Sequence, residues 1–460
     1  MFFHVLAMEK PNIVMIIADD LGVMDVGFNN PKYRTPHIDR LRAEGMLFTQ
    51  AYAPAANCAP SRACVFSGQY SPRHGVYTVG SSERGNPQYR KIIPVKNTVH
   101  LNPDILTLSE ALKAGGYKTI HLGKWHLGND PTKQGFDVNV GGYSLGSPKG
   151  GYFIPVKGEV SNYNDRYPKG THIADIFADQ AVTFIKASKD EKFFMHMAYY
   201  LIHTPIQAVP GMVEKYGHPN DRRAAYASMI EKMDESIGKI MAELDAQGLY
   251  ENTLVLFSSD NGAHSDISSQ KPFRSGKGSY FEGGIREPLV VRWPREVAPE
   301  SVCHIPVMGI DFFPTFLEVA GLSVPRGKIL DGVSLLPLLT DSGVFPRRAL
   351  FWHFPIYLQS YSGKNDDAHD PLFRTRPGSV LRRGKWKFHE YFENGRQELY
   401  DLENDPGERQ NVAALYPEKT KKFYDELTQW REEVAAPVPS KLNPKYNAQA
   451  EKDALLKALE

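Results

Sequence analysis

Cysteine is scarce in this sequence, which has only Cys58, Cys64 and Cys303 in 460 residues. Three cysteines are too few for a disulfide framework, and we expect no bond between Cys64 and Cys303. Long apolar runs are missing too, because no stretch approaches the roughly 20 residues that a membrane-spanning helix needs. The sequence therefore predicts no membrane span.

The sequence also has no excess of positive or of negative charge. The chain has 54 Lys and Arg against 53 Asp and Glu, a formal net charge of +1. This balance gives no electrostatic reason to expect a nucleic-acid partner, although a local basic pocket could still bind a polyanion. Residues 1–8 are too short for a secretory signal and lack its basic start and cleavage pattern. Either a signal has been removed or the protein stays inside the cell.

Two apolar, β-branched runs, residues 12–18 and 253–259, are typical of buried parallel strands. Each run is followed at once by a pair of oxygen donors. The four residues are Asp19, Asp20, Asp260 and Asn261. Open α/β sheets bind ligands at the carboxyl ends of their strands, and hard oxygen donors suit Ca²⁺ or Mg²⁺. The alternative is a pair of unrelated solvated turns.

The rest of the chain alternates between strand and helix patterns, as parallel sheets do. We expect helices at 35–45, 107–116, 173–185 and 222–247, and strands at 118–122, 192–199 and 289–293. Residues 70–104 and 129–170 lack periodicity and are expected to be long loops. Residues 379–402 alternate like antiparallel strands, and a helix is expected at 410–434.

These patterns predict an α/β fold with a large mixed, mostly parallel sheet flanked by helices. A chain of this length exceeds the ~250–300 residues of a single core. We therefore expect an α/β domain at 9–340, a smaller C-terminal α+β subdomain at 341–436, and a polar tail at 437–460. The tail is expected to wrap the surface or to fray.

Cys58 lies just before an expected helix start in Cys58-Ala59-Pro60-Ser61-Arg62, because Pro suits the first helical turn. An anion at that point would meet backbone N–H groups, the positive end of a helix dipole and a guanidinium. Taken alone, the segment is also compatible with an ordinary loop-to-helix junction.

The same five residues resemble the Cys-x-Pro-Ser-Arg signature of the type I sulfatases. The resemblance implies the alkaline-phosphatase-like fold and hydrolysis of sulfate esters. It also implies that a separate formylglycine-generating enzyme oxidises Cys58 to formylglycine, whose hydrated aldehyde attacks sulfur. A periplasmic or secreted full-length form is then expected.

The family also supplies a metal site that the strand-end residues match. The resemblance implies one divalent cation, usually Ca²⁺ with Mg²⁺ as the alternative, which contacts the modified Cys58. Its ligands are implied to be Asp19, Asp20, Asp260 and Asn261. Asp260 is also implied to accept the proton of the attacking hydrate.

Five further residues match the family's catalytic positions. Lys124 and Lys277 correspond to the two lysines that hold the sulfate. His126 corresponds to the residue that hydrogen-bonds the formylglycine hydrate and assists release of sulfate, and His203 to the acid that protonates the leaving group. Arg62 is implied to orient the nucleophile and to offset its charge.

The substrate is expected to be a sulfated oligosaccharide or glycan, because residues 146–153 and 350–355 resemble bacterial carbohydrate sulfatases. We expect exo-acting removal of a 4-O-sulfate from galactose or N-acetylgalactosamine, as in chondroitin, dermatan or carrageenan. Four residues are candidates for sugar contacts: His172, His353, Arg374 and Arg376.

Several alternatives remain open. One is a 6-O- or 2-O-specific glycan sulfatase or a general arylsulfatase. Another is a phosphodiesterase or phosphonate hydrolase of the same superfamily, which the second lysine and the Cys-x-Pro-Ser-Arg segment disfavour. The last is a non-catalytic protein that binds sulfated glycans, if Cys58 is never modified.

Overall fold

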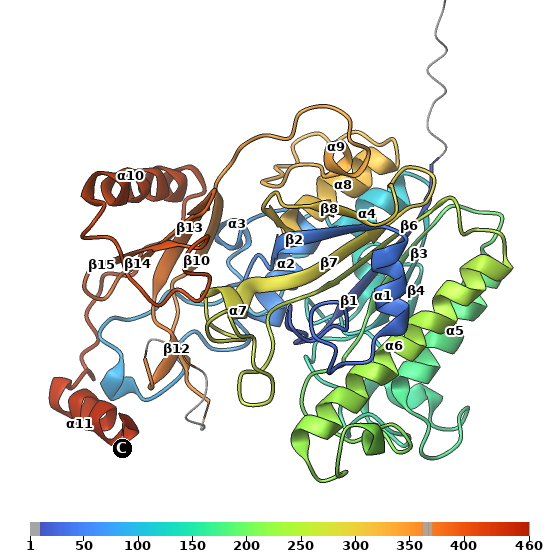
Figure 1. The fold of residues 1–460 in the computed structure, drawn as a ribbon, viewed down its shortest axis with the longest axis horizontal. Coiled ribbons are helices and arrows are strands. Elements are labelled where there is room, and N and C mark those ends of the chain that lie inside the picture. Colours follow the sequence, from blue (N-terminus) through green and yellow to red (C-terminus); the bar gives the residue numbers. More distant parts are fainter. Residues whose placement is uncertain (1–9, 362–366, 368–369, 460) are drawn as a thin grey trace, which may run out of the picture.

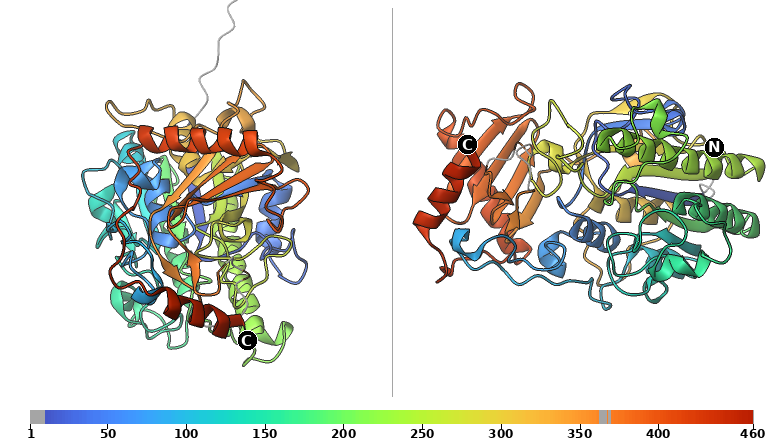
Figure 2. Two further views of the ribbon diagram at one scale, coloured as in Figure 1. Left: turned by 90° about the vertical axis from the view of Figure 1, so that its left-hand side faces the viewer. Right: turned by 90° about the horizontal axis from the view of Figure 1, so that it is seen from below.

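The computed structural model describes residues 10–361, 367 and 370–459. Residues 1–8, which lack the pattern of a secretory signal, lie outside the described residues. A large helix-flanked sheet fills one side of the molecule, and a smaller antiparallel sheet lies beside it (Figures 1 and 2). No helix among the described residues is long and apolar enough to cross a membrane.

The large sheet has nine strands in the order β4-β3-β5-β1-β6-β7-β2-β8, with β9 also paired to β2. All neighbours are parallel except β7, which is antiparallel to both β6 and β2. The bounds are β1 Asn12–Ala18, β2 Met46–Tyr52, β3 Lys118–Gly123, β4 Val138–Val140, β5 Phe193–Ala198, β6 Thr253–Ser259, β7 Arg286–Arg292, β8 Ser301–Cys303 and β9 Val307–Met308.

Helices cover both faces of this sheet, and the side chains of β1 alternate between two apolar cores. Val14 and Ile16 pack with α1, α5 and α6, whereas Ile13 and Met15 pack with α2, α4 and α8. Helix bounds are α1 Pro36–Ala43, α2 Cys58–Ser67, α3 Ser71–His74, α4 Leu108–Ala114, α5 Ile173–Ala187, α6 Arg222–Ala246, α7 Glu282–Ile285, α8 Phe312–Val319 and α9 Leu336–Leu339. Five short 3₁₀ helices are η1 Pro87–Tyr89, η2 Pro131–Gln134, η3 Gly158–Tyr163, η4 Val213–Lys215 and η5 Gly309–Asp311.

The C-terminal region contains a four-stranded antiparallel sheet in the order β10-β13-β14-β15. Helix α10 packs on it through Phe423, Leu427 and Trp430, and α11 lies near the end of the chain (Figure 1). The bounds are β10 Leu350–Phe354, β11 Leu358–Gln359, β12 Phe373–Thr375, β13 Gly378–Arg383, β14 Trp386–Tyr391, β15 Arg396–Asp401, α10 Pro417–Glu433 and α11 Ala448–Leu459.

The expected fold class is confirmed: a mostly parallel, helix-flanked sheet with a smaller antiparallel C-terminal region. The tail wraps the surface, where the backbone N–H of Asn443 donates to the carbonyl of Lys91 at 2.9 Å. It also contains α11, which was not expected. The three cysteines are free and buried, so Cys64 and Cys303 are not bonded to each other.

Candidate active site

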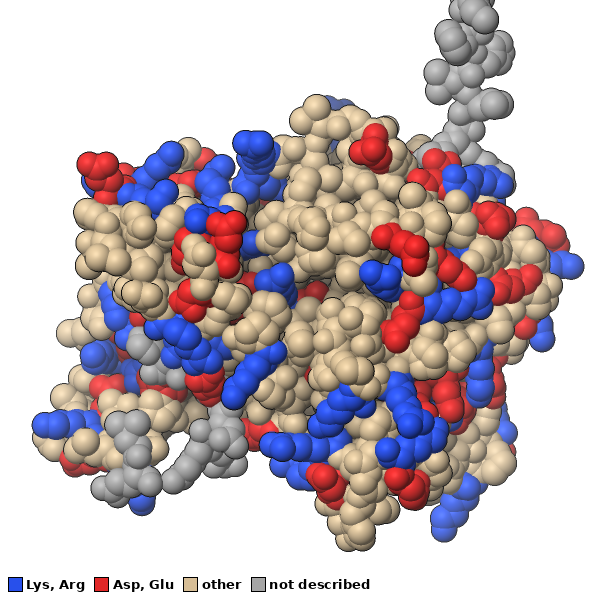
Figure 3. Space-filling model, viewed as in Figure 1, with Lys and Arg blue, Asp and Glu red and all other residues tan. Residues whose placement is uncertain are grey.

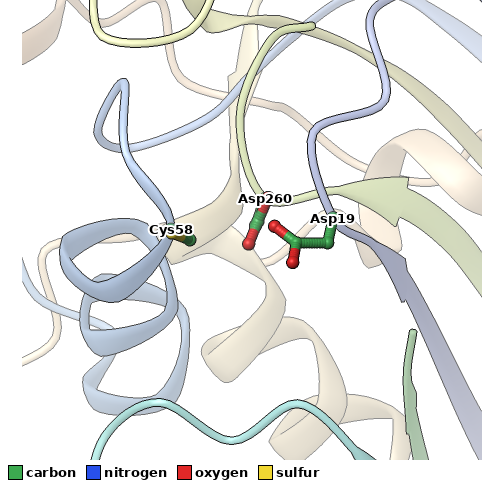
Figure 4. A group of neighbouring side chains, drawn as sticks. All are labelled: Asp19, Cys58 and Asp260. Atoms are coloured by element: carbon green, nitrogen blue, oxygen red, sulfur yellow. The ribbon is translucent and has the colours of Figure 1, made fainter. Parts of the chain in front are cut away.

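The strand ends bring the expected oxygen donors together. Strands β1 and β6 are parallel neighbours with Ala18 opposite Ser259, so the residues that follow each strand leave the sheet side by side. Asp19 and Asp260 point toward one another, and Cys58 reaches the same place from the start of α2 (Figure 4). One carboxylate oxygen from each aspartate and the Cys58 sulfur lie within 4.8 Å of one another.

This cluster fits a divalent cation. Asp19 Oδ1 and Asn261 Oδ1 are buried and have no hydrogen-bond partner among the described residues, and a buried acceptor normally has one. Burial, together with the neighbouring Asp260 and Asp20, raises the pKa of Asp19 well above its usual range. A bound cation would satisfy both oxygens and favour the ionised carboxylate. Carboxylate and amide oxygens are the ligands that Ca²⁺ and Mg²⁺ prefer.

Cys58 is the first residue of α2, slightly earlier than the start expected near Pro60. Cys58 is 2% exposed, and burial raises the pKa of its thiol although Lys124 and Lys277 act in the opposite direction. Because the thiolate is the nucleophilic form of cysteine, the unmodified side chain is a weak nucleophile at neutral pH.

Three buried cations surround this cluster. Arg62 Nε donates to Asp260 Oδ2 at 2.8 Å, and Arg62 Nη1 to the carbonyl of Lys124 at 2.8 Å. Lys124 Nζ lies 2.6 Å from Asp19 Oδ2, and Lys277 Nζ lies 2.6 Å from Asp20 Oδ1.

These cations make the site favourable for anions. Burial alone would raise the pKa of Asp20, but Lys277, His203 and Lys124 outweigh it and hold that pKa far below its usual range. Arg62 Nη2 is buried and has no partner among the described residues. The arrangement supplies positive charge and a free N–H donor for a bound anion.

Two histidines complete the group. His126 is 8% exposed with φ at 63°, and its Nδ1 has no partner among the described residues. Burial, followed by Lys124 and Arg62, lowers its pKa well below the usual value. His203 Nδ1 lies 2.8 Å from the carbonyl of Thr204, so this nitrogen carries the proton, while Nε2 lies 3.9 Å from Asp20 Oδ2.

Of the four residues expected to contact sugar, the structure places one at the site and three away from it. Arg374 lies at the site, because its Nη1 donates to the carbonyl of Lys277 at 3.0 Å and its guanidinium stacks 3.6 Å from the ring of Tyr361. The expectation for Arg376 is corrected, because its guanidinium forms ion pairs with Glu393 at 2.9 Å and with Asp370 and Glu451.

The two histidines expected to contact sugar are also corrected. His353 is buried, with Nδ1 2.8 Å from Ser379 Oγ and Nε2 3.0 Å from the carbonyl of Pro437. His172 is buried at the start of α5, where Nδ1 accepts from the N–H of Ala174 at 3.1 Å. Neither ring offers an exposed polar atom to a ligand.

Tyr152 supports the site and was missed as a functional residue. Its hydroxyl lies 2.6 Å from the carbonyl of Tyr200 and 2.7 Å from that of His203, so it fixes the segment that carries His203. The only sequence signal was an aromatic residue after Gly150 and Gly151 in an irregular stretch.

A mostly parallel α/β sheet with a carboxylate cluster, buried cations and a potential nucleophile at its carboxyl edge defines a metal-dependent hydrolase of anionic esters. The sulfatase family profile matches residues 11–322, and the profile for the C-terminal part of N-sulphoglucosamine sulphohydrolase matches residues 276–434. The chain belongs to the sulfatase family. It is a sulfuric ester hydrolase, and this family uses a metal ion and formylglycine.

The relatives include carbohydrate sulfatases. A sulfatase of Formosa agariphila is 31% identical, covering 89% of this chain and 86% of that protein. N-acetylgalactosamine-6-sulfatase of Rattus norvegicus is 32% identical, covering 75% of this chain and 69% of that protein. The crystal structure of Ps i-CgsB in complex with k-i-k-neocarrahexaose superimposes with a TM-score of 0.75 at 26% identity, covering 98% of both chains.

Proposed function

We propose that the chain hydrolyses a sulfate ester on a carbohydrate with formylglycine made from Cys58 as the nucleophile. The observation that carries this proposal is the position of Cys58, which lies within 4.8 Å of carboxylate oxygens of Asp19 and Asp260. Formylglycine supplies a hydrated aldehyde that attacks sulfur, and a thiol whose pKa burial has raised does not. Asp260 accepts the proton of the nucleophile in this proposal.

A divalent cation held by Asp19, Asp20, Asp260 and Asn261 would stabilise the negative charge of the sulfate group and orient it. Lys124 and Lys277 bind the sulfuryl oxygens, since their ammonium groups lie at the same cluster. Arg62 holds Asp260 in place through its 2.8 Å contact. His126, whose Nδ1 has no partner among the described residues, hydrogen-bonds the formylglycine hydrate in this proposal.

His203 protonates the leaving oxygen in this proposal. Burial, followed by Lys277, lowers the pKa of its free ring to about 3, so the ring is neutral at pH 7 before substrate binds. A sulfate anion beside Nε2 favours the charged imidazolium and raises that pKa. Proton donation by His203 is thereby coupled to the presence of substrate.

For the substrate, we propose a 4-O-sulfate on galactose or N-acetylgalactosamine at a chain end. The likeness to a protein crystallised with a carrageenan-type hexaose supports this class of glycan. A 6-O-sulfate is the second candidate, because several relatives are N-acetylgalactosamine-6-sulfatases. A glycan of this kind is extracellular, so we also propose that the full-length protein is exported.

The test is sulfate release by protein co-expressed with a formylglycine-generating enzyme. Matched oligosaccharides with 4-O- or 6-O-sulfated N-acetylgalactosamine are compared, and mass spectrometry of the Cys58 peptide reports its conversion. Release from the 4-O isomer is the expected result, and Cys58→Ala should release none. Release from the 6-O isomer alone would replace the proposed regiochemistry, and converted protein that cleaves only aryl sulfates would refute a carbohydrate substrate.

The role of His203 is tested with His203→Ala on two substrates. An aryl oxide leaves without much protonation, whereas a sugar alkoxide needs a proton. We expect kcat to fall by about 10²–10⁴-fold on the sugar sulfate and much less on an aryl sulfate. Equal losses on the two substrates would count against His203 as the acid.

A further inference from the structure

A cavity that is lined in part by the loop preceding Lys277 has no role in the steps above. Its volume is about 780 Å³, within the ~300–1,000 Å³ typical of small-ligand sites. The loop from Ser265 to Ser275 forms one wall, and Lys32, Tyr33 and Arg223 face it from other parts of the chain.

The rim of this cavity is basic. Lys32, Arg223 and Lys271 are exposed, and none of them forms an ion pair with another residue that the structure describes. Asp367 is the one acidic residue among the described residues that line the cavity, and Arg409 binds it, with 2.7 Å between Nη1 and Oδ1. In the region of the cavity, near the start of α6, blue side chains gather on the face that Figure 3 shows.

The floor of the cavity offers unused hydrogen-bonding groups. Ser275 is 7% exposed, and its Oγ has no partner among the described residues. The same holds for Ser265 Oγ, which lines the cavity as well. Three cations that form no ion pair with another described residue make this cavity suited to an anion.

The cavity and the catalytic cluster share their supporting loops. The N–H of Lys277 donates to the carbonyl of Ala263 at 2.8 Å, which fastens the catalytic lysine to the cavity wall. Gln270 lines the cavity, accepts from the N–H of Met24 at 3.0 Å and donates to Asp25 Oδ2 at 3.2 Å. A ligand in the cavity would therefore lie one loop away from the residues that hold the sulfate.

We propose that this cavity binds a second anionic group of the substrate, a sulfate or a carboxylate on a sugar that adjoins the one whose ester is cleaved. The proposal rests on the proposed carbohydrate substrate. Lys32, Arg223 and Lys271 attract the group. The protein thereby prefers glycans with a charge on successive sugars over those with a single sulfate.

The experiment compares three oligosaccharides with the same cleavable sulfate. On the adjoining sugar they carry a second sulfate, a carboxylate or neither, and an aryl sulfate serves as a substrate without sugar. The variants are Lys271→Ala, Arg223→Ala and the double variant. Lys189→Ala is the matched control. This exposed lysine lies between α5 and the start of β5, and therefore at the amino ends of the parallel strands, whereas the cluster lies at their carboxyl ends.

We expect wild-type KM to be lowest for a doubly charged oligosaccharide, and the charged group that lowers it identifies the preferred anion. Each single variant should raise that KM about two- to five-fold, and the double variant about ten-fold or more, with kcat unchanged. The singly sulfated oligosaccharide, the aryl sulfate and Lys189→Ala should show no change. The preference should weaken at high salt.

Two results would overturn the proposal: equal wild-type KM values for all three oligosaccharides, or equal KM increases on the aryl sulfate and the doubly charged glycan. Failure of the proposed function looks different, because wild-type protein would then cleave the aryl sulfate and none of the oligosaccharides. In that case calorimetric titration with the same oligosaccharides tests whether the cavity binds an anionic sugar. Equal affinities of wild type and the double variant for the doubly charged oligosaccharides would refute this binding.

Discussion

Lys387 joins the C-terminal sheet to the region of the active site through a buried ionic network. Its ammonium lies 3.0 Å from both Glu282 Oε1 and Glu408 Oε1, and all three side chains are 0% exposed. Glu282 begins α7, which follows the loop that carries Lys277. Lys387→Met leaves two buried carboxylates without their shared cation. We expect the free energy of unfolding to fall by about 3–5 kcal/mol at pH 7.

The cost of this substitution should depend on pH. Burial alone would raise the pKa of Glu282, but Lys387, Arg286 and Arg382 outweigh it and lower that pKa to about 2. A carboxyl with a lowered pKa stabilises the fold above its unfolded value near 4.5, and this contribution is lost as the pH falls toward 2. Without Lys387 the buried carboxyl of Glu282 protonates more readily. The difference between variant and wild type should therefore shrink between pH 7 and pH 4.5.

Urea unfolding followed by tryptophan fluorescence measures both effects, at pH 7 and at pH 4.5. Lys385→Met is the matched control, because Lys385 precedes the same strand and its side chain is 40% exposed beside Asp401 and Glu403. An exposed pair of this kind contributes little to stability. Equal small losses for the two variants, or a cost for Lys387→Met that does not change with pH, would refute the reasoning.

Two further predictions concern the metal site and a buried histidine. Calcium should raise the Tm of the wild-type protein, since a ligand that binds only the folded state adds ~2.7 kcal/mol to the free energy of unfolding at 100 times its Kd. Asp19→Asn should lose this response. An unchanged calcium shift in the variant would contradict the proposed ligand set. Burial lowers the pKa of His353 to about 3, so its neutral ring stabilises the fold above pH 6.5 and that stability declines as the pH falls. Between pH 7 and pH 4.5 the wild type should therefore lose about 2–3 kcal/mol more than His353→Gln in urea unfolding. Parallel losses would show that this ring does not determine the acid response.

Much of the fold could be predicted because its central strands are continuous apolar runs. The patterns at 12–18, 118–122 and 253–259 correspond to β1, β3 and β6, and the helix expected at 107–116 corresponds to α4. Strand β2 was missed because Thr49 and Gln50 interrupt its apolar pattern. The reversed direction of β7 could not be predicted, since local patterns show that a strand is buried but not which way its neighbours run.

The oxygen donors at the strand ends were easier to predict than the surroundings of the expected sugar contacts, because the backbone of the sheet brings those donors together. Asp19 and Asp260 follow neighbouring parallel strands, so the sheet itself brings them together and a sequence pattern is enough to find them. Arg374 and Arg376 lie two positions apart, yet one stacks on Tyr361 at the site and the other is held by Glu393 and two further carboxylates. Their different roles depend on residues that the tertiary fold supplies. Positions outside the strand ends therefore depend on loops and charge pairing, which a short motif does not record.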